Sequence, residues 1–302
     1  MKISHFIEKH FWLFLIAGLI IGLWVPLAFE KFPAFMPKIL LGLMLFFVFL
    51  KIDSVQILEN IRNYKLMIYV SSVYMLIIPV SFFLIFNIFD SELAIGILLL
   101  TAMPAGVSTP ALTDIAKGNV SLSMSLAIVS QLIAPFTVPL LFLLIDFSSH
   151  SIDKLLMLKD IAILVFIPMI IAQLIKKYFP LTIKKRLHLF TSLNVLLLFA
   201  FVYLTISSQR NYFLENPVSL LWKLAVLYLV FILLHLIGYL ICFKQNKENR
   251  IAVAIGAAYM NNGMAIVLAA SYFKPEVLVL MVLSELPWNT LLAPFKRIIR
   301  QF

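Results

Sequence analysis

Charged residues are scarce in this sequence. Only 13% of the 302 residues are charged, whereas 63% are hydrophobic. A soluble domain usually has about 25% charged and about 45–50% apolar residues. The chain has too little polar surface for a water-soluble enzyme, so we expect it to lie in a lipid bilayer.

Cysteine is almost absent, because Cys242 is the only one. A single thiol excludes an internal disulfide, a CxxC redox pair and a Cys-rich metal site. The sequence also has no Walker A pattern, so we predict no ATPase activity and see no sign of an ATPase partner. We therefore expect no cofactor and no bound metal beyond a coupling ion, H⁺ or Na⁺.

Acidic residues number 14 against 24 Lys and Arg, which gives a formal net charge of +10. In a soluble protein this excess would suggest nucleic acid as a partner. Here the basic residues sit in short breaks between apolar runs, where they set membrane topology. We therefore predict no nucleic-acid partner.

Ten apolar segments are long enough to cross a bilayer, and the backbone must be helical within each. They are residues 11–29, 36–52, 66–89, 91–116, 120–145, 160–179, 188–208, 219–243, 250–273 and 275–294. The predicted fold is an all-α polytopic membrane protein of ten transmembrane helices, forming one transporter unit over residues 1–302.

The basic residues favour one orientation of these spans. If both termini are cytoplasmic, the outside connections hold 7 of the 24 basic residues: Lys31, Lys38, Lys154, Lys159, Arg210, Lys223 and Lys274. The other 17 lie inside, as expected for cytoplasmic loops. We predict a multi-pass protein of the cell (inner) membrane with both termini in the cytoplasm.

The two halves of the chain share features about 154 residues apart. Pro104 to Pro110 interrupts span four, and Asn261 to Gly263 interrupts span nine. Ser130-Gln131-Leu132 in span five corresponds to Ser284-Glu285-Leu286 in span ten. Interrupted helices at matching places in two five-span halves are typical of inverted repeats in transporters.

Each interruption carries polar side chains that could bind a solute. In span four, Pro104, Gly106 and Pro110 disfavour a helix, and Ser108 and Thr109 stand beside them. Freed backbone groups are tolerated in a bilayer only where they are buried or line a wet cavity. This break is a candidate binding site, and the alternative is a simple proline kink.

In span nine, Asn261 and Asn262 precede Gly263. Two amides are costly in hydrocarbon unless they find partners, and facing half-helix ends offer partial charges of both signs. We predict substrate binding here, and the alternative is asparagine that joins helices by hydrogen bonds.

These segments resemble the bile acid:sodium symporter family. Its spans four and five are similar to the stretch from Pro104 to Leu141, PAGVSTPALTDIAKGNVSLSMSLAIVSQLIAPFTVPLL. Its span nine is similar to MNNGMAIVLAA, which begins at Met260, and its turn after span two is similar to LKIDSVQILENIRNYK. The resemblance implies two inverted five-helix repeats with broken, crossing helices four and nine. It also implies a panel part of residues 1–60 and 160–210, a core part of 66–145 and 219–296, and organic-anion substrates.

Several sodium ligands of that family are replaced in this sequence. On the alignment that the resemblance gives, the positions in spans four and five fall on Thr109, Pro110, Ser123 and Ala127. Those in spans three and nine fall on Tyr74, Gly256 and Met260. Of the side chains in spans four and five, Thr109 and Ser123 retain an oxygen, and the acidic ligand is missing. The related arsenite permeases have a cysteine where Ala105 stands, so metalloid transport is not expected.

Few ionisable residues lie within spans. Glu285 in span ten is the only carboxylate well inside one, so we predict that it couples transport to protons, with Thr109 and Ser123 as further ion-coupling residues. The alternative is a carboxyl held permanently neutral by a hydrogen bond to Asn289 or to a carbonyl of a broken helix. His235 in span eight is a candidate proton relay, and the alternative is a neutral imidazole bonded to a backbone carbonyl.

The sequence thus predicts a secondary active transporter of a small organic anion by alternating access, coupled more readily to H⁺ than to Na⁺. An intramembrane enzyme would need an activated nucleophile or a metal site, and a receptor or channel of the same fold is the other alternative.

Overall fold

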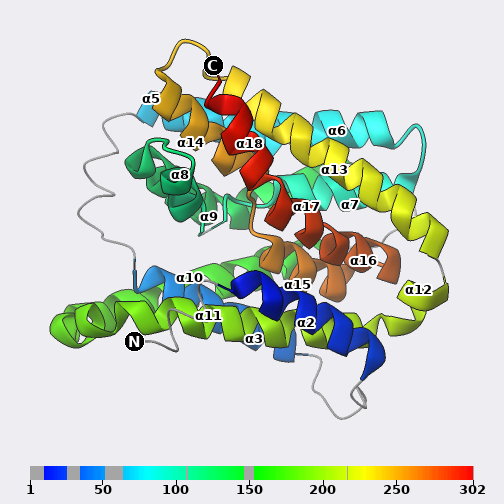
Figure 1. Cartoon of the computed structure of the whole chain (residues 1–302), viewed down its shortest axis with the longest axis horizontal. Helices are drawn as coiled ribbons and strands as arrows, with labels where there is room; N and C mark the ends of the chain where they lie inside the picture. The colour runs from blue at the N-terminus through cyan, green and yellow to red at the C-terminus, as the bar shows by residue number, and fades with distance from the viewer. Residues whose placement is uncertain are drawn as a thin grey trace. The chain divides into compact units, whose positions relative to one another are not determined.

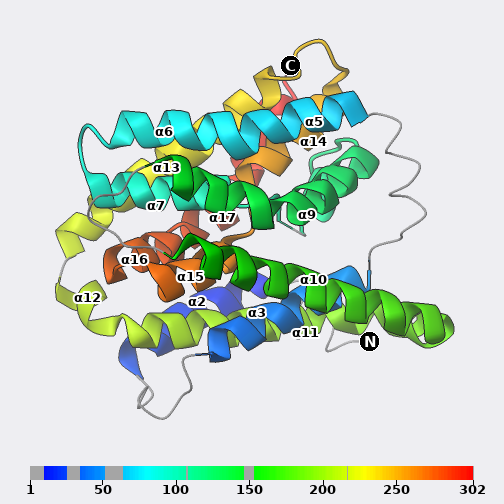
Figure 2. The same ribbon diagram turned by 180° about the vertical axis from the view of Figure 1, so that it is seen from behind.

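The computed structural model describes residues 10–25, 35–51, 64–106, 108–145, 153–215 and 217–301. Within these ranges the named elements are helices, and none is a strand (Figure 1, Figure 2). Six helical segments of this described part are long and apolar enough to cross a membrane, and three shorter apolar helices accompany them. The described part of the chain is thus all-helical, as expected, and contains several candidate membrane spans.

In the first half of the chain, up to residue 145, two of the predicted spans are divided: span three contains a π-helical turn and span four is interrupted. The helices are α2 (Phe11–Trp24), α3 (Met36–Phe49), α5 (Tyr64–Ser72), the π-helical turn η3 (Val73–Ile77), α6 (Ile78–Phe86), α7 (Ser91–Ala102), α8 (Thr109–Ile115) and α9 (Val120–Leu144). The turn expected after span two falls mostly on residues 52–63, outside the described residues.

The second half has three long helices, α10, α11 and α13, and its last two spans are divided. Its helices are α10 (Lys154–Tyr178), α11 (Pro180–Ser208), α12 (Arg210–Glu215), α13 (Pro217–Leu240), α14 (Lys247–Ala258), α15 (Asn262–Tyr272), α16 (Pro275–Leu283), α17 (Glu285–Thr290) and α18 (Leu292–Ile299). α11 begins eight residues before the predicted span, because Pro180 has the backbone angle of a first helical turn. Lys184, Lys185 and Arg186 are therefore helical.

One compact unit contains α2, α3, α10 from Asp160 onward, α11 and α12. In it, α2 and α3 pack against α11. An ion pair between Lys38 and Asp160 joins α3 to α10, and the Gln173 amide nitrogen donates to the Phe49 carbonyl at 3.2 Å. These contacts hold together helices that are more than 100 residues apart in sequence.

The second compact unit contains α5 to α9 and α13 to α18. Its central helices are buried on every side: all residues from Leu93 to Ala102 of α7 and from Ile251 to Ala258 of α14 are buried. The outer helix α13 instead exposes Leu229, Ile232 and Leu236 along one face. An exposed apolar face on a long apolar helix is what a bilayer solvates.

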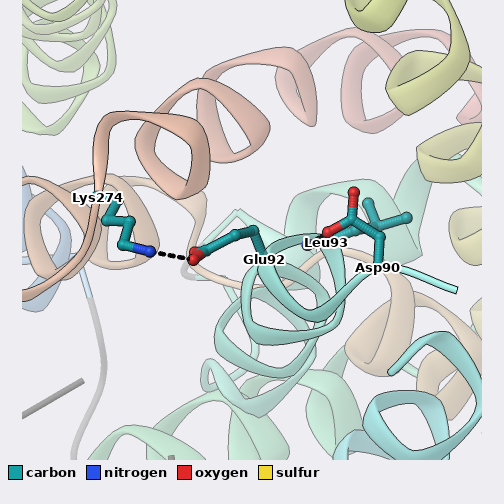
Figure 3. Close-up of polar contacts among 4 residues, drawn as sticks. All are labelled: Asp90, Glu92, Leu93 and Lys274. Atoms are coloured by element: carbon teal, nitrogen blue, oxygen red, sulfur yellow. Dashed lines mark hydrogen bonds and ion pairs between the residues drawn. The ribbon is translucent and has the colours of Figure 1, made fainter. Parts of the chain in front are cut away.

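The amino end of α7 is fixed by two acidic residues (Figure 3). The Asp90 carboxylate accepts from the Leu93 N–H at 3.0 Å and so caps the helix. Glu92 accepts from the Lys274 ammonium at 2.5 Å, and Lys274 immediately precedes α16. One ion pair thus joins the starts of α7 and α16 within this unit.

Candidate functional site

The first interruption separates α7 from α8. α7 ends at Ala102, and Met103 is extended with ψ at 146°. Pro104 has no N–H to continue the helix, and Pro110 stands in the first turn of α8. The predicted break in span four is confirmed at residues 103–108, of which Val107 is not described.

The second interruption separates α14 from α15. α14 ends at Ala258, and α15 begins at Asn262. The Asn261 side-chain oxygen accepts from the Met264 N–H at 3.1 Å, so Asn261 caps the amino end of α15. The predicted break in span nine is confirmed, and one of its two asparagines has a capping role.

The two interruptions meet through their backbones. The Gly106 N–H donates to the Tyr259 carbonyl at 2.7 Å, and the Asn261 N–H donates to the Pro104 carbonyl at 2.8 Å. Ala105 and Met260 thereby form an isolated antiparallel bridge. We call Pro104–Gly106 together with Tyr259–Asn261 the crossing. The expected contact between the breaks is present, and it satisfies backbone groups that each helix leaves free.

Gly106 is required where the two backbones approach. A Cβ atom at this residue would lie 2.7 Å from the Tyr259 oxygen and 3.1 Å from the Met260 oxygen. Real Cβ atoms do not come so close to backbone oxygen, so a side chain here would push the two segments apart.

Span five supplies side chains to the crossing that the sequence-based site omitted. The Ser130 hydroxyl accepts from the Ala105 N–H at 3.1 Å, and the Gln131 amide nitrogen donates to the Ala105 carbonyl at 3.3 Å. Tyr74, in the π-helical turn η3, is buried with its hydroxyl toward Ser130 and Ala105. The signal for Ser130 and Gln131 was their likeness to Ser284 and Glu285.

Span ten supplies the corresponding groups on the other side. The Asn262 amide nitrogen donates to the Ser284 hydroxyl at 3.0 Å, and the Trp288 indole N–H donates to the Met260 carbonyl at 3.2 Å. Ser284 donates to the Met281 carbonyl at 2.6 Å, as Ser130 donates to the Ala127 carbonyl at 3.0 Å. The same local bond thus recurs 154 positions apart.

Glu285 is buried beside the crossing, with 5% of its surface exposed. The Asn289 amide nitrogen lies 3.2 Å from one carboxyl oxygen and 2.7 Å from the Glu285 carbonyl, and the Asn262 side chain also faces the carboxyl group. An amide nitrogen can donate to a carboxylate and an amide oxygen can accept from a carboxylic acid. This environment can therefore hold either protonation state.

The structure brings only some of the other predicted residues together. Thr109 is fully buried, and its hydroxyl donates to the Gly106 carbonyl at 2.7 Å, whereas Ser108 is exposed. Ser123 is buried and accepts from the Thr113 hydroxyl at 2.9 Å, so its oxygen is engaged with α8.

His235 lies in α13 at the edge of this region. Its Nδ1 is 2.7 Å from the Phe231 carbonyl, and its ring packs against Tyr259 and Phe295 at centroid distances of 5.1 and 4.5 Å. Its buried Nε2 and the buried Tyr259 hydroxyl both lack a hydrogen-bond partner among the described residues.

Comparison with known proteins places this geometry in context. The SBF-like CPA transporter family matches residues 9–291. The chain is 27% identical over 282 residues to the uncharacterized sodium-dependent transporter YocS of Bacillus subtilis, covering 91% of this chain and 85% of YocS. It is 23% identical over 213 residues to the uncharacterized protein YbaS of the same organism, covering 68% of this chain and 69% of YbaS.

Proposed function

This chain belongs to the SBF-like CPA transporter family, of bile acid:sodium symporter type, and we propose that it is a secondary active transporter whose substrate binds at the crossing. Membership of this family points to a membrane transporter rather than an enzyme. The observation that carries the proposal is the antiparallel bridge between Ala105 and Met260 with Asn262 and Thr109 beside it. Irregular backbone deep in a membrane protein is characteristic of solute-binding sites.

The substrate class we propose is a small organic anion. The amino end of the eleven-residue helix α15 starts at the crossing, and helix amino ends carry a partial positive charge. Asn261 and Asn262 add amide N–H groups, and the Asn261 amide nitrogen is buried without a partner among the described residues. A carboxylate suits such donors.

The architecture we propose is ten spans in two inverted repeats that work by alternating access. Two observations support it: the hydrogen bonds Gly106 to Tyr259 and Asn261 to Pro104 are exchanged by a two-fold rotation, and the serine bonds of α9 and α16–α17 correspond. The compact unit with the crossing would be the core, residues 66–145 and 219–296. The other, 1–60 and 160–210, would be the panel. Both termini would face the cytoplasm from the inner membrane.

The coupling ion we propose is a proton carried by Glu285. Its burial and its amide neighbours Asn289 and Asn262 support this role. The positions that the resemblance assigns to the glutamate and glutamine sodium ligands of span nine hold Gly256 and Met260, and Ser123 accepts a hydrogen bond from Thr113. Since the relative YocS is named sodium-dependent, the alternative coupling ion is sodium, and the experiment must distinguish it from the proton. His235 would relay the proton.

The test is transport in proteoliposomes. A stabilisation screen of the purified protein with carboxylates and sterols, with and without sodium, first selects a labelled substrate. Glu285→Gln mimics the protonated carboxyl, so it should abolish accumulation driven by a pH gradient while substrate exchange persists. Asn262→Ala should reduce both, because it removes a substrate donor.

Glu276→Gln, at the start of α16, is the matched control and should behave as the wild type. Unchanged accumulation by Glu285→Gln would refute the coupling role. Accumulation that follows a sodium gradient at constant pH would assign the coupling to sodium. Normal transport by Asn262→Ala would move the substrate site elsewhere.

A further inference from the structure

Basic side chains gather at one end of the second compact unit. The turn between α13 and α14, the amino end of α14, the α8–α9 turn and the end of α18 contribute Lys117, Lys244, Lys247, Arg250, Arg297 and Arg300, which we call the basic end. In both views the start of α14 and the end of α18 lie together (Figure 1, Figure 2). All of these side chains are exposed except Arg250, which is half-buried.

Packing between helices brings α18 to this end. Tyr228 of α13 lies 2.9 Å from Thr290 through their hydroxyls, and His235 of α13 packs on Phe295. In both pairs the residue numbers rise together, from Tyr228 to His235 in α13 and from Thr290 to Phe295 in α17 and α18. The segment α17–α18 therefore runs beside α13 and parallel to it. Arg300 is five residues beyond Phe295, as Leu240 is beyond His235, which brings Arg300 level with the end of α13.

Hydrogen bonds hold the backbone that carries these charges. The Tyr69 hydroxyl donates to the Ile241 carbonyl at 3.2 Å, and Arg250 donates to the Tyr239 carbonyl at 3.1 Å, with its guanidinium 3.8 Å from the Tyr239 ring centroid. The Asn119 N–H donates to the Glu248 carbonyl at 2.9 Å. Two turns and two helices therefore present their cations on a fixed scaffold.

Lys117 occupies a conformation that favours glycine. Its φ is 65°, and it is the only residue other than glycine with positive φ in the described part of the chain. The left-handed region costs a lysine free energy that glycine avoids. At the next residue, a Cβ on Gly118 would lie 2.7 Å from the Ile251 side chain, so this turn abuts α14. A strained residue that retains a charge here points to a use for that charge.

Apolar side chains are exposed among these cations. Phe243 is 66% exposed with the Lys244 ammonium 5.7 Å from its ring centroid, and Ile298 is 56% exposed next to Arg297. The acidic residues at this end, Asp114 and Glu248, are outnumbered. Cations beside exposed apolar groups match the boundary between lipid headgroups and acyl chains.

We propose that the basic end binds the phosphate groups of anionic lipids in the adjacent leaflet. The charges lie on several elements and stand beside Phe243 and Ile298, which suits lipids whose acyl chains contact the apolar residues. A nucleic acid would not use the exposed apolar residues, and free phosphate would need no such neighbours. This interaction does not depend on what the protein transports.

The experiment measures the thermal unfolding midpoint of detergent-purified full-length protein mixed with phosphatidylglycerol, phosphatidylcholine or inorganic phosphate. Phosphatidylglycerol should raise the midpoint by several degrees, and phosphatidylcholine and phosphate should not. The variant Lys244→Gln/Lys247→Gln/Arg300→Gln should lose most of this shift. The control Lys31→Gln/Lys154→Gln/Lys159→Gln, whose lysines the charge bias assigns to the other side, should keep it.

The variant Lys117→Gly distinguishes loss of lipid binding from loss of folding. Glycine relieves the backbone strain, so the midpoint without lipid should be equal or higher while the phosphatidylglycerol shift falls. Equal shifts with phosphatidylglycerol and phosphatidylcholine would overturn the proposal, as would an undiminished shift in the triple variant. An equal shift with inorganic phosphate would assign the site to free phosphate and overturn the lipid proposal.

Discussion

At the scale of single residues, two buried glycines of the second compact unit have opposite surroundings. A Cβ on Gly106 would lie 2.7 Å from a backbone oxygen of the crossing. A Cβ on Gly256, in the middle of α14, would find its nearest neighbour, a Leu126 methyl, at 4.0 Å. The same one-carbon change therefore tests close approach at one position and helix propensity at the other.

We expect Gly106→Ala to destabilise the protein by about 1–3 kcal/mol, the usual effect of overpacking a rigid site. Gly256→Ala should be neutral or stabilise by up to about 1 kcal/mol, because alanine favours a helix interior. Thermal unfolding of the two purified variants checks this. Equal unfolding midpoints for the two variants would mean that the crossing can accommodate a methyl group at residue 106 without loss of stability.

Residue chemistry allowed part of the site to be predicted. Asn261, Asn262 and Thr109 are costly in hydrocarbon unless paired, which singled them out before any contact was known. Tyr74 carried no such signal, because an aromatic residue in an apolar run is ordinary. Lys223, counted with an outside connection, lies near the start of predicted span eight and is buried within α13.

At the scale of helices, two different contacts join the ends of helices in the second compact unit. One is the ion pair of Glu92 with Lys274 (Figure 3), and the other is the hydrogen bond from the Asn119 amide to the Asn249 side-chain oxygen at 2.8 Å. Asn119 and Lys274 stand at the starts of α9 and α16. The hydrogen bond to Glu92 raises the pKa of Lys274 above its usual 10.5.

The raised pKa predicts a pH-dependent stability difference between the wild type and Lys274→Gln. A folded pKa above the unfolded value stabilises the protein below the unfolded pKa and loses this effect as pH rises through the folded pKa. The wild type should unfold at a higher temperature than the variant at pH 8, and this difference should shrink as pH rises above 10.5 and through the raised folded pKa.

Because the pair is exposed, 1 M salt should also reduce that difference at pH 8. Lys159→Gln, measured at the same pH values, is the control for removing an exposed lysine charge. A difference for Lys274→Gln that does not shrink as pH rises above 10.5 would show that the ion pair does not cause it.

Helix boundaries were predictable where the chain itself breaks the helix. As expected, the break with Pro104 and Pro110 separates α7 from α8, and the break with the asparagine pair separates α14 from α15. The π-helical turn η3 was not foreseen. Pro79 clashes with the carbonyl four residues before it. A helix can relieve this clash by kinking or by forming a wider π-helical turn such as η3, and the neighbouring helices decide which occurs.

At the scale of the whole molecule, apolar length predicted an all-helical chain with several helices long enough to cross a membrane, but not which helices pack together. α2 and α11 form a close pair although more than 150 residues separate them. Such pairings depend on the fit of side-chain surfaces, which hydropathy does not encode. The inverted repeat was suggested because its signals, the two breaks and the two serine motifs, share one spacing.

The bridge between Ala105 and Met260 also has a consequence for biosynthesis. The two residues are 155 positions apart, so at about 5–20 residues per second Ala105 emerges from the ribosome about 8–30 s before its partner. During that interval the Pro104 carbonyl and the Gly106 N–H lack the bonds they make in the finished protein. Such groups are costly in hydrocarbon, so the first half has to wait near water or the insertion machinery.

We therefore expect the first half, residues 1–150, to be degraded when it is produced alone and to accumulate when residues 151–302 are produced in the same cell. Pulse-chase labelling of the two fragments, separately and together, measures this. A first half that is equally long-lived alone would mean that α7 and α8 settle without the second half. If the second half does protect the first, then a newly made first half survives in the cell only if span nine is made soon after span four.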